Sequence, residues 1–425
     1  MLILFEDELV TQLYPITLGK PAYTIGCGSY RLLDLVAGLA GHVHAVVRPH
    51  LTAFRQAEPL PKPGGAAPRE GVAYVNARLV PHVKSIEQIR RLLAAGRPGI
   101  VRPNAEHRPE NQRTPGGNGE VAVAIVPPGT TLLPDTATAK DLAAWLTQLK
   151  LQELDSPRLA LFDYPHDIVR HHLTILPANL EHRLSQGGYR EAQPGVFVAE
   201  GALLGEHVVA HTQEGPIVLD RQASIGPFCY LRGPAYVGPQ ARVIEHAAIK
   251  DGVSLGHTTK VGGEVEGSII EPYTNKQHHG FLGHSFLGSW VNLGAGTCNS
   301  DLKNTYGSVN MEYQGRRVAT GMQFVGAIVG DYAKTAINTG IFTGKTVGVC
   351  SMVYGFVTTN VPSFTNYARL FGQVTEAPVE VMVATQARMF VRRQVEQRPC
   401  DVQLLQAMYE LTRHERQLAG EPLSL

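Results

Sequence analysis

The sequence of 425 residues predicts an α/β domain, then a parallel β-helix, then a helical C-terminal segment. Three observations support this order. Short apolar runs alternate with helical patterns up to about residue 165, an aliphatic residue recurs every six positions from residue 219, and apolar residues return to helical spacing after residue 378. We expect the boundaries at 1–165 for the α/β domain, 166–194 for a linker helix, 195–364 for the β-helix and 365–425 for a C-terminal helical cap.

The composition favours a soluble globular protein. Lys and Arg together number 38 against 37 Asp and Glu, and hydrophobic residues make up 44% of the chain, which argues against a disordered or strongly basic protein. The chain starts without a basic segment, and no run reaches the ~18 apolar residues that a membrane span needs. We therefore expect a cytoplasmic protein without a membrane or nucleic-acid partner. The five cysteines include no Cys-x-x-Cys pair, so neither a disulfide framework nor a cysteine zinc site is expected.

Residues 1–165 alternate short apolar runs with helical patterns, which is typical of an α/β domain with a mainly parallel sheet. The apolar runs are Leu2–Phe5, Val43–Val47, Val121–Val126 and Leu159–Phe162, and the helical patterns are Ser85–Ala95 and Ala137–Gln152. Pro59–Pro68 and Pro109–Gly119 are rich in Pro and Gly and are expected to be exposed loops. The segment that begins at Asp163 predicts a helix to about Arg183.

An aliphatic residue recurs every six positions in the second half of the chain. The series runs without a miss through Leu219, Ile225, Leu231, Val237, Val243, Ile249, Leu255 and Val261. A small or β-branched residue follows four positions after each of them, from Ala223 to Val265. Helices repeat about every 3.6 residues and strands about every two, whereas a six-residue period is typical of a parallel β-helix, in which three short strands form one triangular coil. We expect the aliphatic residues to fill the interior of the prism.

Two segments interrupt the repeat, residues 266–280 and residues 298–321. We expect both to form loops on one face of the solenoid, often the face that binds ligands. The register resumes at Phe281, Leu287 and Leu293, with Ser285, Val291 and Thr297 as small partners, and then at Val329, Thr335, Ile341, Val347 and Val353. Residues 378–420 return to helical spacing. There we expect two helices that cap the open end of the solenoid or pack on a neighbouring molecule.

The segment Leu13-Tyr-Pro-Ile-Thr-Leu-Gly-Lys-Pro-Ala resembles the L-x-P-[IL]-T-x-x-[KR]-P segment of the sugar-1-phosphate nucleotidyltransferases. The resemblance implies a nucleotidyltransferase-like, Rossmann-like domain, with Thr17 and Lys20 binding nucleotide. Two departures oppose catalysis. The family's Gly-rich phosphate-binding turn is replaced by Glu6-Asp-Glu, and Arg78 stands where the family places the aspartate that binds the catalytic Mg²⁺. Mg²⁺ is therefore expected only if this domain is active, and retained uridylyl or thymidylyl transfer is one alternative function.

The β-helix half resembles the acetyltransferase domain of the bifunctional N-acetylglucosamine-1-phosphate uridyltransferase/glucosamine-1-phosphate acetyltransferases. The resemblance is most specific in the segment His278–Thr297 and at Arg232, in Leu-Arg-Gly-Pro-Ala. It implies a left-handed β-helix and a homotrimer with the acetyltransferase site between neighbouring prisms. It also implies an acetyl-CoA-dependent N-acetyltransferase that acts on an amino-sugar phosphate or nucleotide.

This resemblance gives candidate roles to particular residues. Transfer of an acetyl group to an amine needs a base, because a protonated amine has no lone pair, and histidine suits that role near pH 7. His278 is the candidate base, with Glu266 as the carboxylate that orients it. Substrate would be bound by Arg232, Asn292, Lys303 and Lys276, and acetyl-CoA by Gly294, Ala295, Gly296 and Asp301. Asn292 has an alternative role in closing a corner, where its amide would stack on the next coil.

Two other function classes stay open at this point. His246, His279 and His284 have a spacing similar to that of the ligands in the γ-class carbonic anhydrases. That resemblance implies a catalytic zinc site with three histidines and one water. A non-catalytic, trimeric sugar-nucleotide-binding protein is the other alternative, and the departures in the first domain support it.

Overall fold

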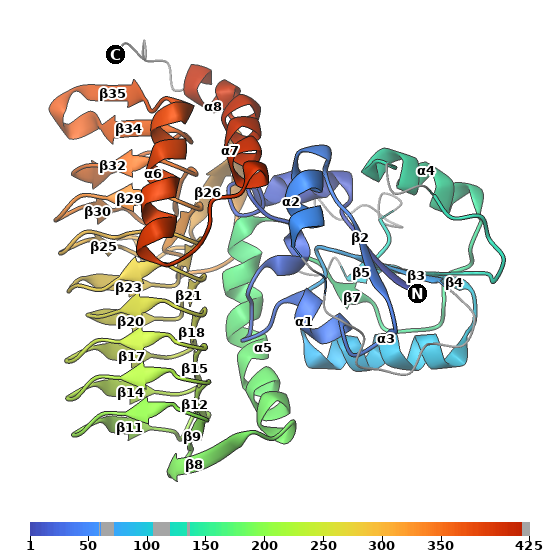
Figure 1. Ribbon diagram of the computed structural model, residues 1–425, viewed down its shortest axis with the longest axis horizontal. Helices are drawn as coiled ribbons and strands as arrows, with labels where there is room; N and C mark the ends of the chain where they lie inside the picture. The colour runs from blue at the N-terminus through green and yellow to red at the C-terminus, as the bar shows by residue number, and fades with distance from the viewer. Residues whose placement is uncertain (59, 61–71, 105–119, 134–136, 419–425) are drawn as a thin grey trace. The chain divides into compact units, whose positions relative to one another are not determined.

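The computed structural model describes residues 1–58, 60, 72–104, 120–133 and 137–418, and it divides into two compact units (Figure 1). The N-terminal unit comprises residues 1–13, 20–25 and 30–164. The C-terminal unit comprises residues 14–19, 26–29 and 165–425. Residues 14–19 and 26–29 thus belong to the C-terminal unit, although they lie near the start of the chain.

A five-stranded sheet with the order β2-β1-β3-β6-β4 forms the centre of the N-terminal unit. Its strands are β1 (Leu2–Phe5), β2 (Val43–Val46), β3 (Val72–Asn76), β4 (Gly99–Val101) and β6 (Val123–Val126). β6 is antiparallel to both neighbours and the other strands share one direction, so the expected α/β domain with a mainly parallel sheet is confirmed. The expected loops at 59–68 and 109–119 lie, apart from residue 60, outside the described residues.

Two helices match the helical patterns of this unit, α3 (Val83–Ala95) and α4 (Ala139–Gln148). α4 begins after Thr138, whose hydroxyl accepts a hydrogen bond from the amide of Asp141 while the Asp141 carboxylate caps Thr138 in return. Leu142 and Leu146 of α4 pack with β1 and β4 in the core of the unit. The shorter elements are α1 (Leu32–Val36), α2 (Thr52–Ala57), the paired strands β5 (Pro103–Asn104) and β7 (Leu159–Ala160), and 3₁₀ turns at Glu8–Leu13, Ala22–Thr24 and Pro49–Leu51.

The helix predicted from Asp163 is α5 (Pro165–Ser185) in the C-terminal unit. The amide of Gly28 donates to Nδ1 of His172 at 2.9 Å, and Nε2 of the same ring lies 3.0 Å from the carbonyl oxygen of Gly252. Burial lowers the pKa of His172 to about 4, so the ring is neutral at pH 7 and donates from Nε2. Asn179 adds a hydrogen bond to the carbonyl oxygen of Gly28 at 2.8 Å. α5 thereby links residues 26–29 to the solenoid.

Most of the C-terminal unit is a left-handed parallel β-helix with three faces. The first face contains β9 (Val196–Ala199), β12 (Ile217–Leu219), β15 (Ala235–Val237), β18 (Val253–Leu255), β21 (Ile269–Ile270), β24 (Phe286–Leu287), β28 (Ala327–Val329) and β31 (Lys345–Val347), with β8 (Tyr189–Gln193) antiparallel to β9 at its start. The second face contains β10 (Leu203–Leu204), β13 (Ser224–Ile225), β16 (Arg242–Val243), β19 (Lys260–Val261), β22 (Asn275–Lys276), β29 (Lys334–Thr335), β32 (Met352–Val353) and β34 (Thr365–Ala368). The third face contains β11 (Val209–His211), β14 (Tyr230–Arg232), β17 (Ala248–Lys250), β20 (Glu264–Glu266), β23 (Phe281–Gly283), β25 (Cys298–Asn299), β30 (Gly340–Ile341) and β33 (Phe356–Val357).

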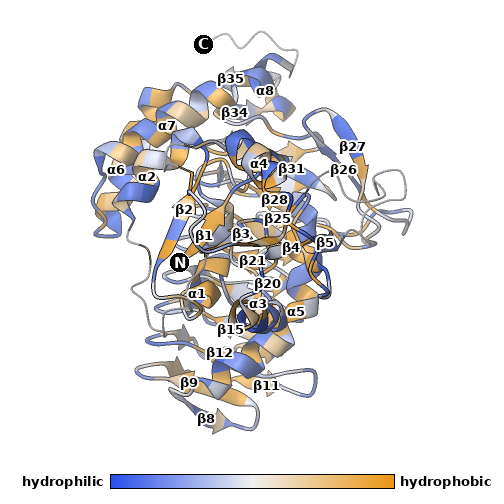
Figure 2. Cartoon of the chain, turned by 90° about the vertical axis from the view of Figure 1, so that its right-hand side faces the viewer, coloured by the Kyte–Doolittle hydropathy of each residue, from blue (hydrophilic) through white to orange (hydrophobic). Residues whose placement is uncertain are grey.

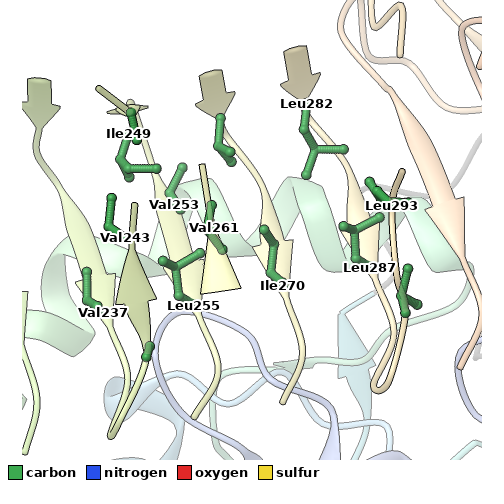
Figure 3. Close-up of a cluster of buried hydrophobic side chains, with 14 of the residues drawn as sticks. Val237, Val243, Ile249, Val253, Leu255, Val261, Ile270, Leu282, Leu287 and Leu293 are labelled. Carbon is green, nitrogen blue, oxygen red and sulfur yellow. The ribbon is translucent and has the colours of Figure 1, made fainter. Parts of the chain in front are cut away.

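The aliphatic residues of the six-residue repeat fill the interior of this prism, as Figure 3 shows for several coils. All eight, from Leu219 to Val261, are buried in one continuous core. Residues on one face lie directly above one another, as in the series Leu219, Val237 and Leu255. The interior positions predicted from the period are therefore confirmed, and their burial supplies the apolar contacts between successive coils.

The expectation of a loop at 266–280 was wrong, because this segment contains β21 and β22 and stays within the solenoid. The corner at Gly262 and Gly263 is shortened, so Val265 already faces inward beside Ile249. Leu282, not Phe281, then takes the next interior position on that face. Sequence periodicity misses this stretch because the repeat shifts in phase there.

Lys276 is a second reason why the sequence did not predict that the solenoid continues through this segment, since a lysine is rarely fully buried. Its side chain is 2% exposed and occupies the interior position that Val261 holds one coil earlier. The ammonium donates to the carbonyl oxygens of Gly262 at 2.8 Å and His278 at 2.6 Å. Burial lowers the pKa of Lys276 to about 8. Lys276 is thus part of the prism and is not the surface cation that the resemblance suggested.

The second interruption, at 298–321, leaves the solenoid as expected only after Asn299, because Cys298–Asn299 form β25 on the third face. It contains the antiparallel hairpin of β26 (Asn310–Tyr313) and β27 (Arg316–Ala319), which lies between β25 and β28 in the chain. The interior register resumes at Val329 and continues through Thr335, Ile341, Val347 and Val353, all buried.

The solenoid ends in an antiparallel pair, β34 and β35 (Gln373–Glu376), and three helices follow. These are α6 (Val379–Arg392), α7 (Pro399–Leu411) and α8 (Arg413–Leu418). α6 lies along the side of the solenoid (Figure 1), where Phe390 packs on Trp290 with ring centroids 4.6 Å apart and Arg393 donates to Asn275. Figure 2 shows hydrophilic and hydrophobic residues interspersed on α6 and α7, as expected for helices with one packed face. None of the described helices is long and apolar enough to span a membrane.

Candidate active site

Within one chain, His278 and Glu266 do not form a base and carboxylate pair. The imidazole of His278 is exposed, at the corner where the second face turns into the third, which we call the His278 corner. Glu266 ends β20, where its carboxylate lies 3.4 Å from Nζ of Lys250 on the neighbouring strand β17. Lys250 also bonds to Glu264 at 2.6 Å, and that hydrogen bond raises the pKa of its ammonium.

A different histidine has the carboxylate partner that a base needs. Nδ1 of His284 lies 2.8 Å from Oδ2 of Asp301, and both side chains are mostly buried but reach the surface, at 16% and 14% exposure. His284 stands at the corner where the third face turns into the first, which we call the His284 corner. Its ring stacks on Phe324 with a centroid distance of 5.2 Å.

The backbone of the His284 corner shapes the space for this ring. Asp251, Gly267 and His284 hold equivalent positions on successive coils, and each has a left-handed φ, of 54°, 53° and 44°. A Cβ at Gly267 would lie 3.0 Å from Cδ2 and 3.1 Å from Nε2 of His284. Glycine at this position both adopts the left-handed backbone and leaves room for the imidazole.

The pair is arranged for proton transfer. A carboxylate that accepts a hydrogen bond from Nδ1–H fixes the tautomer in which Nε2 carries the lone pair. Among the described residues, none forms a hydrogen bond with Nε2 of His284. Nε2 can therefore accept a proton from a bound substrate, and Asp301 stabilises the resulting imidazolium.

Arg232 lies on the same edge of the solenoid, three coils from His284, and its charge is paired with two carboxylates. Nη2 bonds to Glu214 at 2.5 Å and Nε lies 3.0 Å from Asp251. The hydrogen bond to Glu214 and then the charge of Asp251 raise the pKa of Arg232. Burial raises the pKa of Asp251, which the charge of Arg232 opposes. An anionic ligand would reach Arg232 by replacing the exposed Glu214 carboxylate.

Other predicted site residues have structural roles in the solenoid. Oδ1 of Asn292, on the second face, accepts a hydrogen bond from Asn275 one coil away at 3.3 Å, which is the amide stacking expected as its alternative role. The Gly294-Ala295-Gly296 turn packs on the next coil, because a Cβ at Gly294 would lie 2.6 Å from the carbonyl carbon of Ala336.

Lys303 lies in the inserted segment, where its ammonium donates to the carbonyl oxygen of Ser308 at 2.6 Å.

The three histidines of the zinc alternative do not come together within one chain. His246 and His279 both belong to the His278 corner, where His246 stacks on Phe228, whereas His284 lies across β23 at the other corner. In the described part of the chain, no group of three or more His, Cys, Asp or Glu side chains is arranged to hold a metal ion.

In the N-terminal region, Thr17 and Lys20 are both buried. Thr17 belongs to the C-terminal unit and Lys20 to the N-terminal unit. Arg78 follows β3 and is completely buried in the N-terminal unit, where its guanidinium bonds to Asp7, Glu120 and Asp163.

Comparison with known proteins bears on this first half of the chain. Residues 2–185 match the family model described as sugar nucleotidyl transferase. The match includes the motif around Thr17 and the position of Arg78, so the resemblance seen in the sequence is confirmed.

Proteins similar to part of this chain include bifunctional enzymes. A bifunctional protein GlmU of Methanococcus vannielii is 29% identical over 119 residues, which is 28% of each chain. A bifunctional protein GlmU of Ralstonia pickettii is 32% identical over 118 residues, 27% of this chain and 25% of the relative. A bifunctional sugar-1-phosphate nucleotidylyltransferase/acetyltransferase of Sulfurisphaera tokodaii is 27% identical over 143 residues, 33% of this chain and 36% of the relative. The matches thus span about a quarter to a third of the relatives' lengths.

Among solved structures, the UDP-N-acetylglucosamine acyltransferase of Francisella novicida has 13% identity and a TM-score of 0.33, with coverage of 52% of this chain and 87% of that one.

The sequence predicted His284 only as a zinc ligand and Asp301 only as a contact to acetyl-CoA. The signal that joins them is the length of a coil, because hydrogen bonds between adjacent coils in this region join residues 17 positions apart, as in Ser268 with Ser285 and His284 with Asp301. A histidine and an acid at that spacing, both at a corner, are candidates for a pair.

Proposed function

We propose that the C-terminal unit is an acetyl-CoA-dependent N-acetyltransferase that acts on an amino-sugar phosphate or nucleotide, with His284 as the base and Asp301 as its orienting carboxylate. The observation that carries this proposal is the 2.8 Å contact between Nδ1 of His284 and Oδ2 of Asp301 at the surface of the β-helix. The names of the relatives, which combine a nucleotidylyltransferase with an acetyltransferase, support the reaction class.

The chemistry follows from the free lone pair on Nε2. The amino group of the acceptor arrives protonated at neutral pH, and Nε2 of His284 removes the proton. The amine then attacks the thioester carbonyl, a C–N bond forms and the C–S bond breaks. The nitrogen loses a second proton as the amide forms, and the departing CoA thiolate takes up a proton to become the thiol. A positioned base of this kind contributes about 10²–10⁴ in rate. Asp301 stabilises the imidazolium that forms during the transfer.

The acceptor's phosphate is assigned to Arg232, with Lys303 as a second cation. A guanidinium binds a phosphate through two parallel hydrogen bonds, and Arg232 is partly exposed on the same edge of the solenoid as His284, three coils away. The exposed partner Glu214 competes for this guanidinium at 2.5 Å. Acetyl-CoA is the proposed cosubstrate. A homotrimer, with the site between neighbouring prisms, is the proposed assembly.

His278 is the second candidate for the base, since it matches the base position of the resembled acetyltransferases and its imidazole is exposed to solvent. β23 separates His278 from His284 on the third face. Substitution of each histidine alone therefore distinguishes the two assignments.

The test is an assay of free CoA thiol with acetyl-CoA and a panel of amino-sugar phosphates and nucleotides. We expect thiol release that falls by about 10²–10⁴ in His284→Ala and changes little in His279→Ala, an exposed histidine of the other corner. The same loss in His278→Ala with full activity in His284→Ala would transfer the role to His278. No thiol release with any acceptor would favour the non-catalytic sugar-nucleotide-binding alternative.

A further inference from the structure

The guanidinium of Arg78 lies at the centre of three carboxylates in the N-terminal unit. Nε and Nη2 bond to the two carboxylate oxygens of Asp7 at 2.8 and 2.7 Å. Nη2 also bonds to Glu120 at 3.0 Å, and Nη1 bonds to Asp163 at 3.1 Å and to the carbonyl oxygen of Phe162 at 2.6 Å. These hydrogen bonds engage all three nitrogens of a side chain that is 0% exposed.

This arrangement keeps Arg78 charged. Burial by itself lowers the pKa of a guanidinium, but the charge and hydrogen bonds of Asp7, followed by the charges of Asp163 and Glu120, raise the pKa of Arg78 overall. A buried charge persists only when it is paired and hydrogen-bonded. The cluster is therefore an internal ion network with one permanent cation.

The network does not fit a divalent metal. The family resemblance places a Mg²⁺-binding aspartate at position 78, and this chain has a cation there instead. Mg²⁺ requires oxygen ligands in near-octahedral geometry at about 2.0–2.1 Å, whereas here the oxygens surround a planar guanidinium at hydrogen-bonding distances. Across the residues that the structure describes, no cluster of three or more His, Cys, Asp or Glu is spaced for a metal ion.

A cavity of about 490 Å³ lies beside this network in the same unit. Its lining includes Asp7 and Glu120, which hold Arg78, together with Glu8 and apolar residues such as Phe5 and Leu146. Asp7 and Glu8 follow β1, where the resembled family has its phosphate-binding turn. The lining also includes Arg102 and Lys150, so the cations that a phosphate could meet in this cavity are side chains of the protein.

We propose that the guanidinium of Arg78 occupies the place of a divalent metal ion among these carboxylates. The N-terminal unit consequently binds neither Mg²⁺ nor a Mg²⁺–nucleotide complex at Asp7, Glu120 and Asp163. This inference concerns a unit other than the one with the proposed acetyltransferase site, so either can fail without the other.

The first experiment titrates the full-length protein with Mn²⁺, followed by electron paramagnetic resonance, with and without UTP. We expect no Mn²⁺ binding that depends on Glu120. Stoichiometric Mn²⁺ binding by the wild-type protein that is lost in Glu120→Gln would overturn the proposal. This measurement needs no Arg78 variant and stands even if such variants do not fold.

The second experiment measures thermal unfolding of Arg78→Ala with ethylguanidinium or MgCl₂ added at equal ionic strength. We expect a lowered Tm that ethylguanidinium partly restores and Mg²⁺ does not, because the carboxylates are arranged for a planar cation. Arg91→Ala removes an exposed Arg–Glu pair and serves as the control, which neither additive should rescue. Rescue of Arg78→Ala by Mg²⁺ and not by ethylguanidinium, or an unchanged Tm in Arg78→Ala, would contradict the proposal.

Discussion

Asp301 accepts a hydrogen bond from Nδ1 of His284 across one full coil of the β-helix, at 2.8 Å. Asp301 follows β25, at the start of the segment that leaves the solenoid, and His284 forms the corner after β23. The pair therefore depends on the register between two coils as well as on the two residues. Any change that shifts this register alters the distance between base and carboxylate.

Asp301→Asn tests the role of the carboxylate. The amide keeps the shape of the side chain but removes the charge that fixes the tautomer and stabilises the imidazolium, so we expect kcat to fall by about 10²–10⁴ with little change in KM. Steady-state thiol release measures both constants. An Asp301→Asn variant with wild-type kcat would show that Asp301 does not act through His284.

Gly267→Ala tests the room beneath the imidazole. The new Cβ would lie 3.0 Å from Cδ2 of His284, at a φ of 53°, so we expect both a displaced ring and backbone strain of about 1 kcal/mol or more. Gly315→Ala is the matched control, because its φ is also positive, at 74°, but its Cβ would meet nothing within 4 Å. Both variants should lose stability in urea unfolding, and only Gly267→Ala should lose activity. Equal activity in the two variants would show that the position of the His284 ring does not affect catalysis.

Glu214→Gln tests the competition for Arg232. Loss of this exposed carboxylate, which lies 2.5 Å from the Arg232 guanidinium, leaves Asp251 as its anionic partner, and exposed ion pairs are worth about 0–1 kcal/mol. We expect KM for a phosphorylated acceptor to fall by up to about fivefold, with kcat unchanged and no gain for an acceptor without phosphate. Glu264→Gln, which alters the neighbouring pair with Lys250, is the control. A KM that falls equally for both acceptors would argue against a phosphate at Arg232.

Lys276→Met tests the buried ammonium through the pH dependence of stability. The folded-state pKa of about 8 lies below the unfolded value of about 10.4, so the unfolded chain binds more protons between these two pH values. The free energy of unfolding from this group therefore rises with pH across that window, by up to about 1.4 kcal/mol per unit. We expect Lys276→Met to lack this rise in urea unfolding at pH 7.5 to 10.

Lys334, whose pKa burial also lowers to about 8, is present in both proteins and cancels in the comparison. Identical pH slopes for wild type and Lys276→Met would show that the ammonium keeps its proton inside the prism.

The sequence was sufficient to predict the solenoid interior, where the burial of apolar side chains alone decides which residues face inward. The interior series from Leu219 to Val261 depends only on the size and apolarity of the side chains, and every member is buried. The prediction failed at 266–280, where a corner shortened at Gly263 and an interior Lys276 break the period without breaking the solenoid. Such a shift in phase is decided by contacts between coils, which a linear pattern does not contain.

The candidate site was predictable in composition but not in pairing. Both His284 and Asp301 stood among the residues singled out, yet His278 and Glu266 were paired on motif alone. Glu266 lies opposite Lys250 in the strand register and is taken up by that ion pair. Lateral register between coils, not spacing within one coil, determines which acid meets which histidine.

The position of residues 26–29 affects how the protein can be divided. These residues belong to the C-terminal unit, where Gly28 bonds to His172 and the amide of Gly26 donates to Glu271 at 2.7 Å. A fragment that starts at residue 165 would lack these donors, and a fragment that ends there would carry them without their acceptors. The two units are therefore interleaved along the chain, and no single cut, whether by a protease or by a gene fission, separates them intact. During synthesis, residues 26–29 therefore reach their final partners only after α5 and the solenoid have been made.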